Sequence, residues 1–187
     1  LSLAVVRRLF QRAGLRVFDV RNLPTHGGSL RVYGCLSSAA HPETPRVALT
    51  LAREKDGGLE DLQTYRAFQA RAEGIKDDFL SFLIQAKRSG KSVAGYGAAA
   101  KGNTLLNYAG IKPDLFPYVC DAAPAKQGKF MPGSHVPILP PSAISERKPD
   151  FIAILPWNIA EEVRDQLQRS ISHQPLFVTA IPELKLS

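Results

Sequence analysis

The first fourteen residues carry apolar side chains at spacings of three and four, which is the period of a helix with one buried face. That stripe consists of Leu3, Val6, Leu9 and Phe10. Gly14 follows it, and glycine commonly ends helices. Two strand-like runs come next, at 15–23 and 29–36, and turn-forming residues join them. We therefore expect a short helix and an antiparallel hairpin, which together bury too little apolar surface to form a domain.

Residues 37–58 are rich in Ser, Pro and Gly around one small apolar patch, and we interpret them as a connector. A longer helical pattern follows from about 59 to 89 and ends at Gly90, with Gly74 as an expected bend. Its apolar members are Leu62, Tyr65, Phe68, Ala72, Ile75, Phe79, Phe82 and Ala86. This stripe predicts one buried face that docks on the chain's own domain, and a dimer seam is the alternative.

From residue 91 onward, strand-like and helix-like segments alternate. Strands are expected at 92–96, 116–120, 150–155 and 175–180, and helices at about 103–109, 141–147 and 159–170. Such alternation is typical of an α/β protein with a mostly parallel sheet and helices on both faces. Sheets of this kind bind ligands beyond the carboxyl ends of their strands, so the functional residues are expected there.

The segment 93–104 places the pattern G-x-G-x-x-A between a predicted strand and a predicted helix. Glycine lets the backbone approach phosphate oxygens, and the amides at a helix N-terminus attract negative charge. The segment is not the P-loop of ATP hydrolases, because Lys101 precedes Gly102 instead of following it. A tight turn without a ligand is the alternative. The candidate binding residues are Gly95, Tyr96, Gly97, Ala98, Ala99, Lys101, Asn103 and Thr104.

Two other expected strand ends carry candidate binding residues. Asp121 could accept hydrogen bonds from ribose hydroxyls, or it could cap the turn that follows. Lys126 belongs to a basic loop that could close over a phosphate, and a plain solvated loop is equally compatible. Trp157 could stack on a base or sugar, or belong to the core. Asn158 is a candidate ligand contact, although its spacing to Glu161 also suits a helix cap.

His26 lies between Thr25 and two glycines in the hairpin turn, where it could titrate near neutrality and exchange protons with a substrate. An ordinary surface histidine is the alternative. The remaining histidines show no metal-ligand spacing. No nucleophile–histidine–carboxylate order and no close carboxylate pair stands out either. The sequence therefore predicts neither a metal site nor a hydrolytic site.

The 187 residues include 24 Lys and Arg against 17 Asp and Glu, which gives a formal charge of +7. This excess favours an anionic small molecule, with simple solubility as the alternative. Neither the basic–aromatic clusters of nucleic-acid binders nor an apolar run of ~20 residues for a membrane is evident. Two cysteines suit a reducing cytoplasm better than a disulfide framework. Leu1 opens no signal peptide, and we expect the N-terminus to be cut from something longer.

Five ordered strings resemble one known family. They are LPTHGGSLRVY (23–33), GYGAAAKGNTLLNYAGI (95–111), CDAAPAKQGKFMPGSHVPI (120–138), ILPWN (154–158) and IPEL (181–184). Together they resemble the C-terminal region of the sugar C-methyltransferases, which use S-adenosylmethionine to methylate C3 of keto-deoxysugars carried on a nucleoside diphosphate. The resemblance covers nearly the whole chain.

The resemblance implies three parts: the end of a methyltransferase domain at 1–38, a linker and long helix at 39–90, and a Rossmann-like nucleotide-sugar-binding domain at 91–187. The candidate residues above would face a nucleoside-diphosphate sugar, with His26 in an auxiliary catalytic role. S-adenosylmethionine, zinc and the catalytic base would belong to the parent enzyme upstream, so this chain alone is expected to be inactive. The chain departs from the family at Ala122 and Ala123, where polar residues are usual.

Two other classes of function remain open. Gly95, Gly97, Ala100 and Asp121 also satisfy the fingerprint of an NAD-dependent oxidoreductase. No second substrate domain follows, however, and Lys101 suits the concentrated charge of a diphosphate. The chain could instead be a non-catalytic assembly module that pairs its long helix or bare hairpin edge with another copy, as a homodimer.

Overall fold

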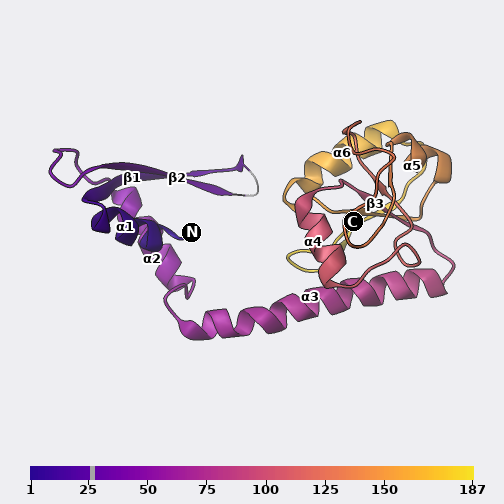
Figure 1. Ribbon diagram of the computed structural model, residues 1–187, viewed down its shortest axis with the longest axis horizontal. Coiled ribbons are helices and arrows are strands. Elements are labelled where there is room, and N and C mark those ends of the chain that lie inside the picture. Colours follow the sequence, from indigo (N-terminus) through magenta and orange to yellow (C-terminus); the bar gives the residue numbers. More distant parts are fainter. Residues whose placement is uncertain (26–27) are drawn as a thin grey trace. The chain divides into compact units, whose positions relative to one another are not determined.

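The computed structural model describes residues 1–25 and 28–187 (Figure 1). Their contacts divide the chain into two compact units, Leu1–Gln69 and Ala70–Ser187, which we call unit 1 and unit 2. His26, the candidate acid–base residue of the hairpin turn, lies outside the described residues.

Unit 1 consists of a hairpin with two helices on one of its faces (Figure 1). The elements are α1 (Leu3–Arg12), β1 (Leu15–Leu23), β2 (Ser29–Leu36) and α2 (Pro45–Asp56). The strands pair antiparallel from Leu15 opposite Leu36 to Leu23 opposite Ser29, with an irregularity at Phe18. A small core of Leu3, Val17, Val20 and Val47 joins the helices to the hairpin. The expected first helix and hairpin are therefore confirmed.

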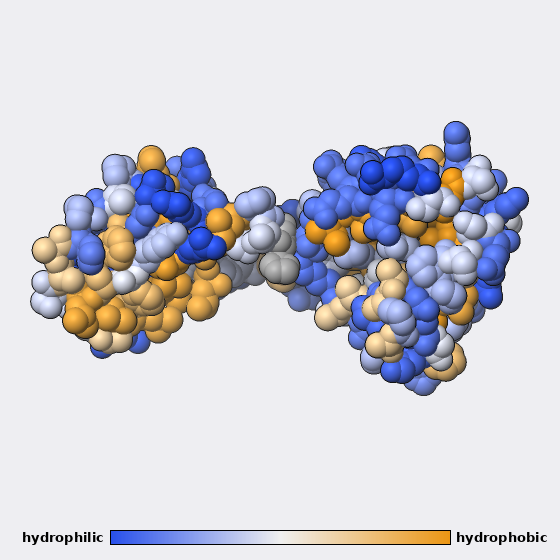
Figure 2. All heavy atoms as spheres, turned by 90° about the horizontal axis from the view of Figure 1, so that it is seen from above, coloured by the Kyte–Doolittle hydropathy of each residue, from blue (hydrophilic) through white to orange (hydrophobic). Residues whose placement is uncertain are grey.

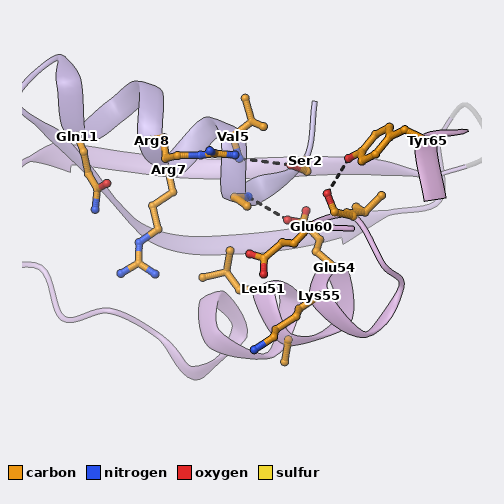
Figure 3. Close-up of a pocket in the computed structure, with 13 residues that line it drawn as sticks. Ser2, Val5, Arg7, Arg8, Gln11, Leu51, Glu54, Lys55, Glu60 and Tyr65 are labelled. Atoms are coloured by element: carbon orange, nitrogen blue, oxygen red, sulfur yellow. Dashed lines mark hydrogen bonds between the residues drawn. The ribbon is translucent and has the colours of Figure 1, made fainter. Parts of the chain in front are cut away.

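A carboxylate on α2 fastens the start of α1. The side chain of Glu54 accepts hydrogen bonds from the amides of Leu3 (2.5 Å) and Ala4 (2.9 Å). Figure 3 shows Glu54 in the pocket that residues of α1 and α2 line. The first amides of a helix have no partner within it, so a carboxylate there satisfies them and complements the helix dipole.

The connector expected at 37–58 is wrong in its second half, which forms helix α2. Pro45 was interpreted as a break, but it occupies the first turn of the helix. Proline is favoured there because its missing amide would have no partner. Val47 is the anchor of α2, with 0% of its surface exposed.

Helix α3 (Leu62–Arg88) runs without interruption through Gly74. Only its second half carries the buried stripe that the sequence predicts. Phe79 and Ala86 are buried and Phe82 is partly buried, whereas the stripe's first three members are exposed, so one buried face along the whole helix is wrong. Those three are Leu62, Tyr65 and Phe68.

Unit 2 contains a six-stranded sheet in the order β5-β4-β3-β6-β7-β8. All neighbouring pairs are parallel except β7 and β8. The strands are β3 (Val93–Tyr96), β4 (Val119–Cys120), β5 (Ile138–Leu139), β6 (Phe151–Ile154), β7 (Leu176–Thr179) and β8 (Lys185–Leu186). The helices are α4 (Ala100–Tyr108), α5 (Ser142–Arg147) and α6 (Ala160–Ser170), with a short turn η2 (Trp157–Ile159) before α6.

Apolar clusters lie on both faces of this sheet. One joins α3 and α4 to the strands through residues such as Phe79 and Leu106. The other joins α5 and α6 to the strands through Ile144 and Leu167. The expected α/β fold, a mostly parallel Rossmann-like sheet with helices on both faces, is confirmed.

Some element boundaries differ from the prediction. The strand expected at 116–120 is limited to Val119–Cys120, and Pro117 within the expected range has no amide to donate to a ladder. The helix expected near 103–109 already begins at Ala100. Strands β5 and β8 were not expected, since two-residue strands leave no alternation to detect.

Candidate functional site

The candidate residues of unit 2 gather at the carboxyl ends of β3, β4 and β6. β3 has β4 on one side and β6 on the other, and the chain proceeds outward from β3 in both directions. The loops that leave β3 and β6 therefore diverge, which makes this the topological switch point where such sheets bind ligands.

Three glycines of the β3–α4 segment are required by packing. A Cβ on Gly95 would lie 2.6 Å from Phe116, and one on Gly102 would lie 2.5 Å from Leu155. Gly97 has a φ of +89° and would place a Cβ 2.5 Å from Pro156. The glycines thus let the loop fit tightly against its own neighbours. These packing requirements explain the glycines without any ligand, so the G-x-G-x-x-A pattern alone is also compatible with a tight turn that binds nothing.

The loop nevertheless presents free backbone donors. Ala99 begins α4 in an extended conformation, and no side chain caps the helix. In the described part of the chain, the amides of Ala100, Lys101 and Gly102 have no acceptor. Unpaired amides at a helix N-terminus, together with its dipole, favour an anion.

The carboxylate of Asp121 is engaged within the protein. Its Oδ2 accepts from the amide of Ala98 (2.7 Å) and from Lys126 Nζ (2.9 Å), and its Oδ1 accepts from the amide of Ala123 (2.8 Å). Burial raises the pKa of Asp121, but the hydrogen bonds from Ala123, Lys126 and Ala98 outweigh it and leave the pKa below its ordinary value. This geometry favours the turn-capping alternative over a ribose acceptor.

Lys101 connects the β3 loop to the end of β6. Its Nζ donates to Asn158 Oδ1 at 3.1 Å and lies 5.7 Å from the centre of the Trp157 ring, within the range of a cation–π contact. The structure therefore brings Lys101 together with Trp157 and Asn158, which follow it by more than fifty positions. Lys101 is exposed, and it belongs to the first turn of α4, whose amides are free.

Most of the chain matches a known family model. The model is described as "C-methyltransferase C-terminal domain", and it matches residues 24–182. This chain belongs to that family. A curated relative, the C-methyltransferase NovU of Streptomyces niveus, is 36% identical over 182 residues. The match covers 97% of this chain and 43% of the relative, so this C-methyltransferase C-terminal domain spans less than half of the relative's length.

A pocket of about 430 Å³ in the C-methyltransferase C-terminal domain opens beside the β3–α4 loop. It is lined by the loop, by Asn103 on α4 and by the basic segment that follows Lys126. The Oδ1 of Asn103 is buried and has no hydrogen-bond partner among the described residues, whereas the hydroxyl of Thr104 donates to the carbonyl of Ala100 within its own helix. Asn103 and Lys126 thus line one pocket, whereas Thr104 does not line it.

A second pocket, of about 450 Å³, lies on the other side of the switch point. Trp157 and Asn158 line it together with Thr179 and Lys185. The last two escaped sequence reasoning, because β8 was not expected and Thr179 follows no recognisable motif. The side chain of Tyr96 is buried in the core, where burial raises its pKa, so only its backbone could meet a ligand.

The described residues offer neither a metal cluster nor a membrane-spanning helix. In that part of the chain, no group of three or more His, Cys, Asp and Glu side chains could hold a metal ion. None of its helices is long and apolar enough to cross a membrane.

Proposed function

We propose that this chain is the nucleotide-sugar-binding part of a sugar C-methyltransferase that uses S-adenosylmethionine. The observation that carries the proposal is the start of α4, where three backbone amides have no acceptor among the described residues and the exposed Lys101 belongs to the same helical turn. Family membership supplies the methyltransferase context, and the loop supplies the ligand chemistry.

The loop suits a diphosphate better than a single carboxylate. Amides at the start of α4 can donate to one phosphoryl group, and Lys101 adds a point charge beside them. Lys126 already pairs with Asp121, so its charge is partly compensated. Trp157 lies next to Lys101 and offers a flat apolar surface on which a sugar or base can stack.

The engagement of Asp121 favours a ligand other than S-adenosylmethionine or NAD at this loop. Both carry an adenosyl ribose, which Rossmann-type sites hold with a carboxylate at the end of the second strand. Asp121 occupies that position, and its two oxygens accept three bonds from the protein. We therefore assign the methyl donor, the catalytic base and the zinc of the proposed parent enzyme to other parts of it, with His26 in an auxiliary role. No methyl-transfer step is assigned to this chain alone.

Calorimetric titration with a deoxythymidine-diphosphate sugar tests the proposal. We expect Lys101→Ala to weaken binding by about 1–3 kcal/mol, roughly 5- to 150-fold, because it removes a charge-assisted contact. Lys87→Ala is the matched control, since it removes an exposed lysine from the last turn of α3. Equal affinities for the Lys101 variant and the native chain would contradict the proposal. Tight binding of NAD without a response to the sugar nucleotide would support the oxidoreductase alternative.

A further inference from the structure

The hairpin of unit 1 has one face that its helices do not cover. Val17, Val20 and Val32 turn toward the core with α1 and α2. Side chains alternate along a strand and directly paired residues share a face, so the register assigns the other set to the opposite face. That set, which we call the outer face, includes Arg16, Asp19, Arg21, Arg31, Tyr33 and Cys35.

Two arginines of the outer face oppose each other directly. Arg21 pairs with Arg31 across the strands, which places their Cβ atoms about 5 Å apart, and both side chains are exposed. Neither has an acidic partner among the residues that the structure describes. Like charges at such positions destabilise a hairpin, so this pair favours a role other than holding the strands together.

The neighbouring charges do not compensate this pair. Asp19 also belongs to β1, but its carboxylate accepts from Arg46 (2.6 Å) and from the hydroxyl of Thr44 (2.6 Å). The Arg46 guanidinium holds the pKa of Asp19 well below its usual range. The guanidinium of Arg16 donates to the carbonyls of Ala39 and His41, which leaves its charge in place.

An aromatic ring orients one of the two arginines. The guanidinium carbon of Arg21 lies 5.9 Å from the centre of the Tyr33 ring. Stacking uses the face of a guanidinium and leaves its N–H groups free at the edge. Figure 2 looks down on the hairpin from the side away from α1 and α2, and it shows strongly hydrophilic side chains gathered beside an apolar area on this part of the molecule.

We propose that Arg21 and Arg31 form a binding site for a diphosphate group. Two planar guanidinium groups side by side match two linked phosphoryl groups, each of which can accept bidentate hydrogen bonds. The bound anion would also remove the repulsion between the two guanidinium groups. This site belongs to unit 1, whereas the Lys101 loop belongs to unit 2.

Nuclear magnetic resonance of the nitrogen-15-labelled chain, titrated with inorganic pyrophosphate, tests the site. We expect the Nε–Hε signals of Arg21 and Arg31 to shift in a saturable way, at an ionic strength held constant with chloride. Arg31→Gln should weaken the pyrophosphate affinity, measured from the Arg21 signal, at least tenfold. Arg12→Gln, which removes an exposed arginine from the last turn of α1, should leave that affinity unchanged.

Further arms separate the possible outcomes. Arg31→Lys keeps the charge but loses the planar guanidinium group, so it should bind more weakly than the native chain and more tightly than the Gln variant. The amide signals of Val20 and Val32 report whether the hairpin stays folded. Equal shifts of Arg8 and Arg12 would show non-specific attraction and overturn the proposal, as would undiminished affinity in folded Arg31→Gln. Shifts confined to the surroundings of Lys101 would also overturn it while leaving the proposed function intact.

Discussion

Asp121 uses its negative charge inside the protein. Its carboxylate ties the end of β4 to the β3–α4 loop through Ala98 and to the next turn through Ala123 and Lys126. It therefore holds the loop in the shape that leaves the amides of α4 free. A residue at the position of a ligand contact thus acts by positioning the groups that would contact the ligand.

Replacement of Asp121 by Asn should lower the free energy of unfolding by about 1–3 kcal/mol, since charged hydrogen bonds of a buried group are lost. The pKa of Asp121 lies below its ordinary value in the folded state, so its stabilisation is complete above the unfolded pKa of about 4 and is lost as the pH falls through the folded value. Urea unfolding between pH 2 and 7 measures both effects. The variant should lose part of the native chain's acid sensitivity; an unchanged profile would contradict the assigned role.

At the residue scale, the sequence predicted the turn between β3 and α4 but not the reason for its glycines. The short pattern identified the turn between β3 and α4, because strand, glycines and helix are contiguous. The groups that exclude a Cβ are remote: Phe116 blocks Gly95, and Leu155 blocks Gly102. The partners of Asp121 could not be derived either, since the choice between a ribose and a protein amide depends on tertiary geometry.

At the scale of elements, the apolar pattern of helix α3 is exposed in the first half of the helix and buried in the second half. Phe79 is 1% exposed and belongs to a core of unit 2, whereas Phe68 is 69% exposed. Periodicity predicted the helix and its face, but it does not state how far along the helix a neighbour extends. The same limit explains α2, where Val47 is the only fully buried anchor of a helix interpreted as a connector.

The two phenylalanines of α3 should respond very differently to truncation. Phe79→Ala should cost about 3–5 kcal/mol, because it removes a buried ring and leaves a cavity. Phe68→Ala should change stability by no more than about 0.5 kcal/mol, as is usual for exposed positions. Chemical denaturation of both variants, followed by circular dichroism, compares them on the same helix. Similar losses at the two positions would show that another surface covers Phe68 in solution.

At the scale of the whole molecule, the two units have separate cores. Leu3, Val17, Val20 and Val47 form the core of unit 1, and two clusters flank the sheet of unit 2. Cooperative units with separate cores open independently. A destabilising substitution in the core of one unit should therefore leave the stability of the other unit unchanged.

Val20→Ala should test this independence. It removes two methyl groups from the small core of unit 1 and should cost that unit about 2 kcal/mol. Native-state hydrogen exchange should then become faster for the amides of β1 and β2 and remain unchanged for those of β3 and β6. Faster exchange in both units would show that they unfold as one.

The overall order of unit 2 followed from the alternation of strands and helices, since connections of this kind are nearly always right-handed and produce parallel sheets. The sequence also predicted helices on both faces. It did not predict β5 and β8, whose two residues each are fixed by pairing with neighbours. Nor did it bring Arg21 and Arg31 together, because their contact depends on the register of the hairpin.

Strand β8 covers the edge that β7 would otherwise expose. Phe177 and Ser187 exchange backbone hydrogen bonds of 2.8 and 2.9 Å, so the last residues occupy the outer flank of β7. Deleting residues 182–187 would leave that flank open while Phe177 and Val178 keep their strong strand preference. An open flank of this kind recruits further chains, so the shortened protein should form concentration-dependent aggregates visible by light scattering.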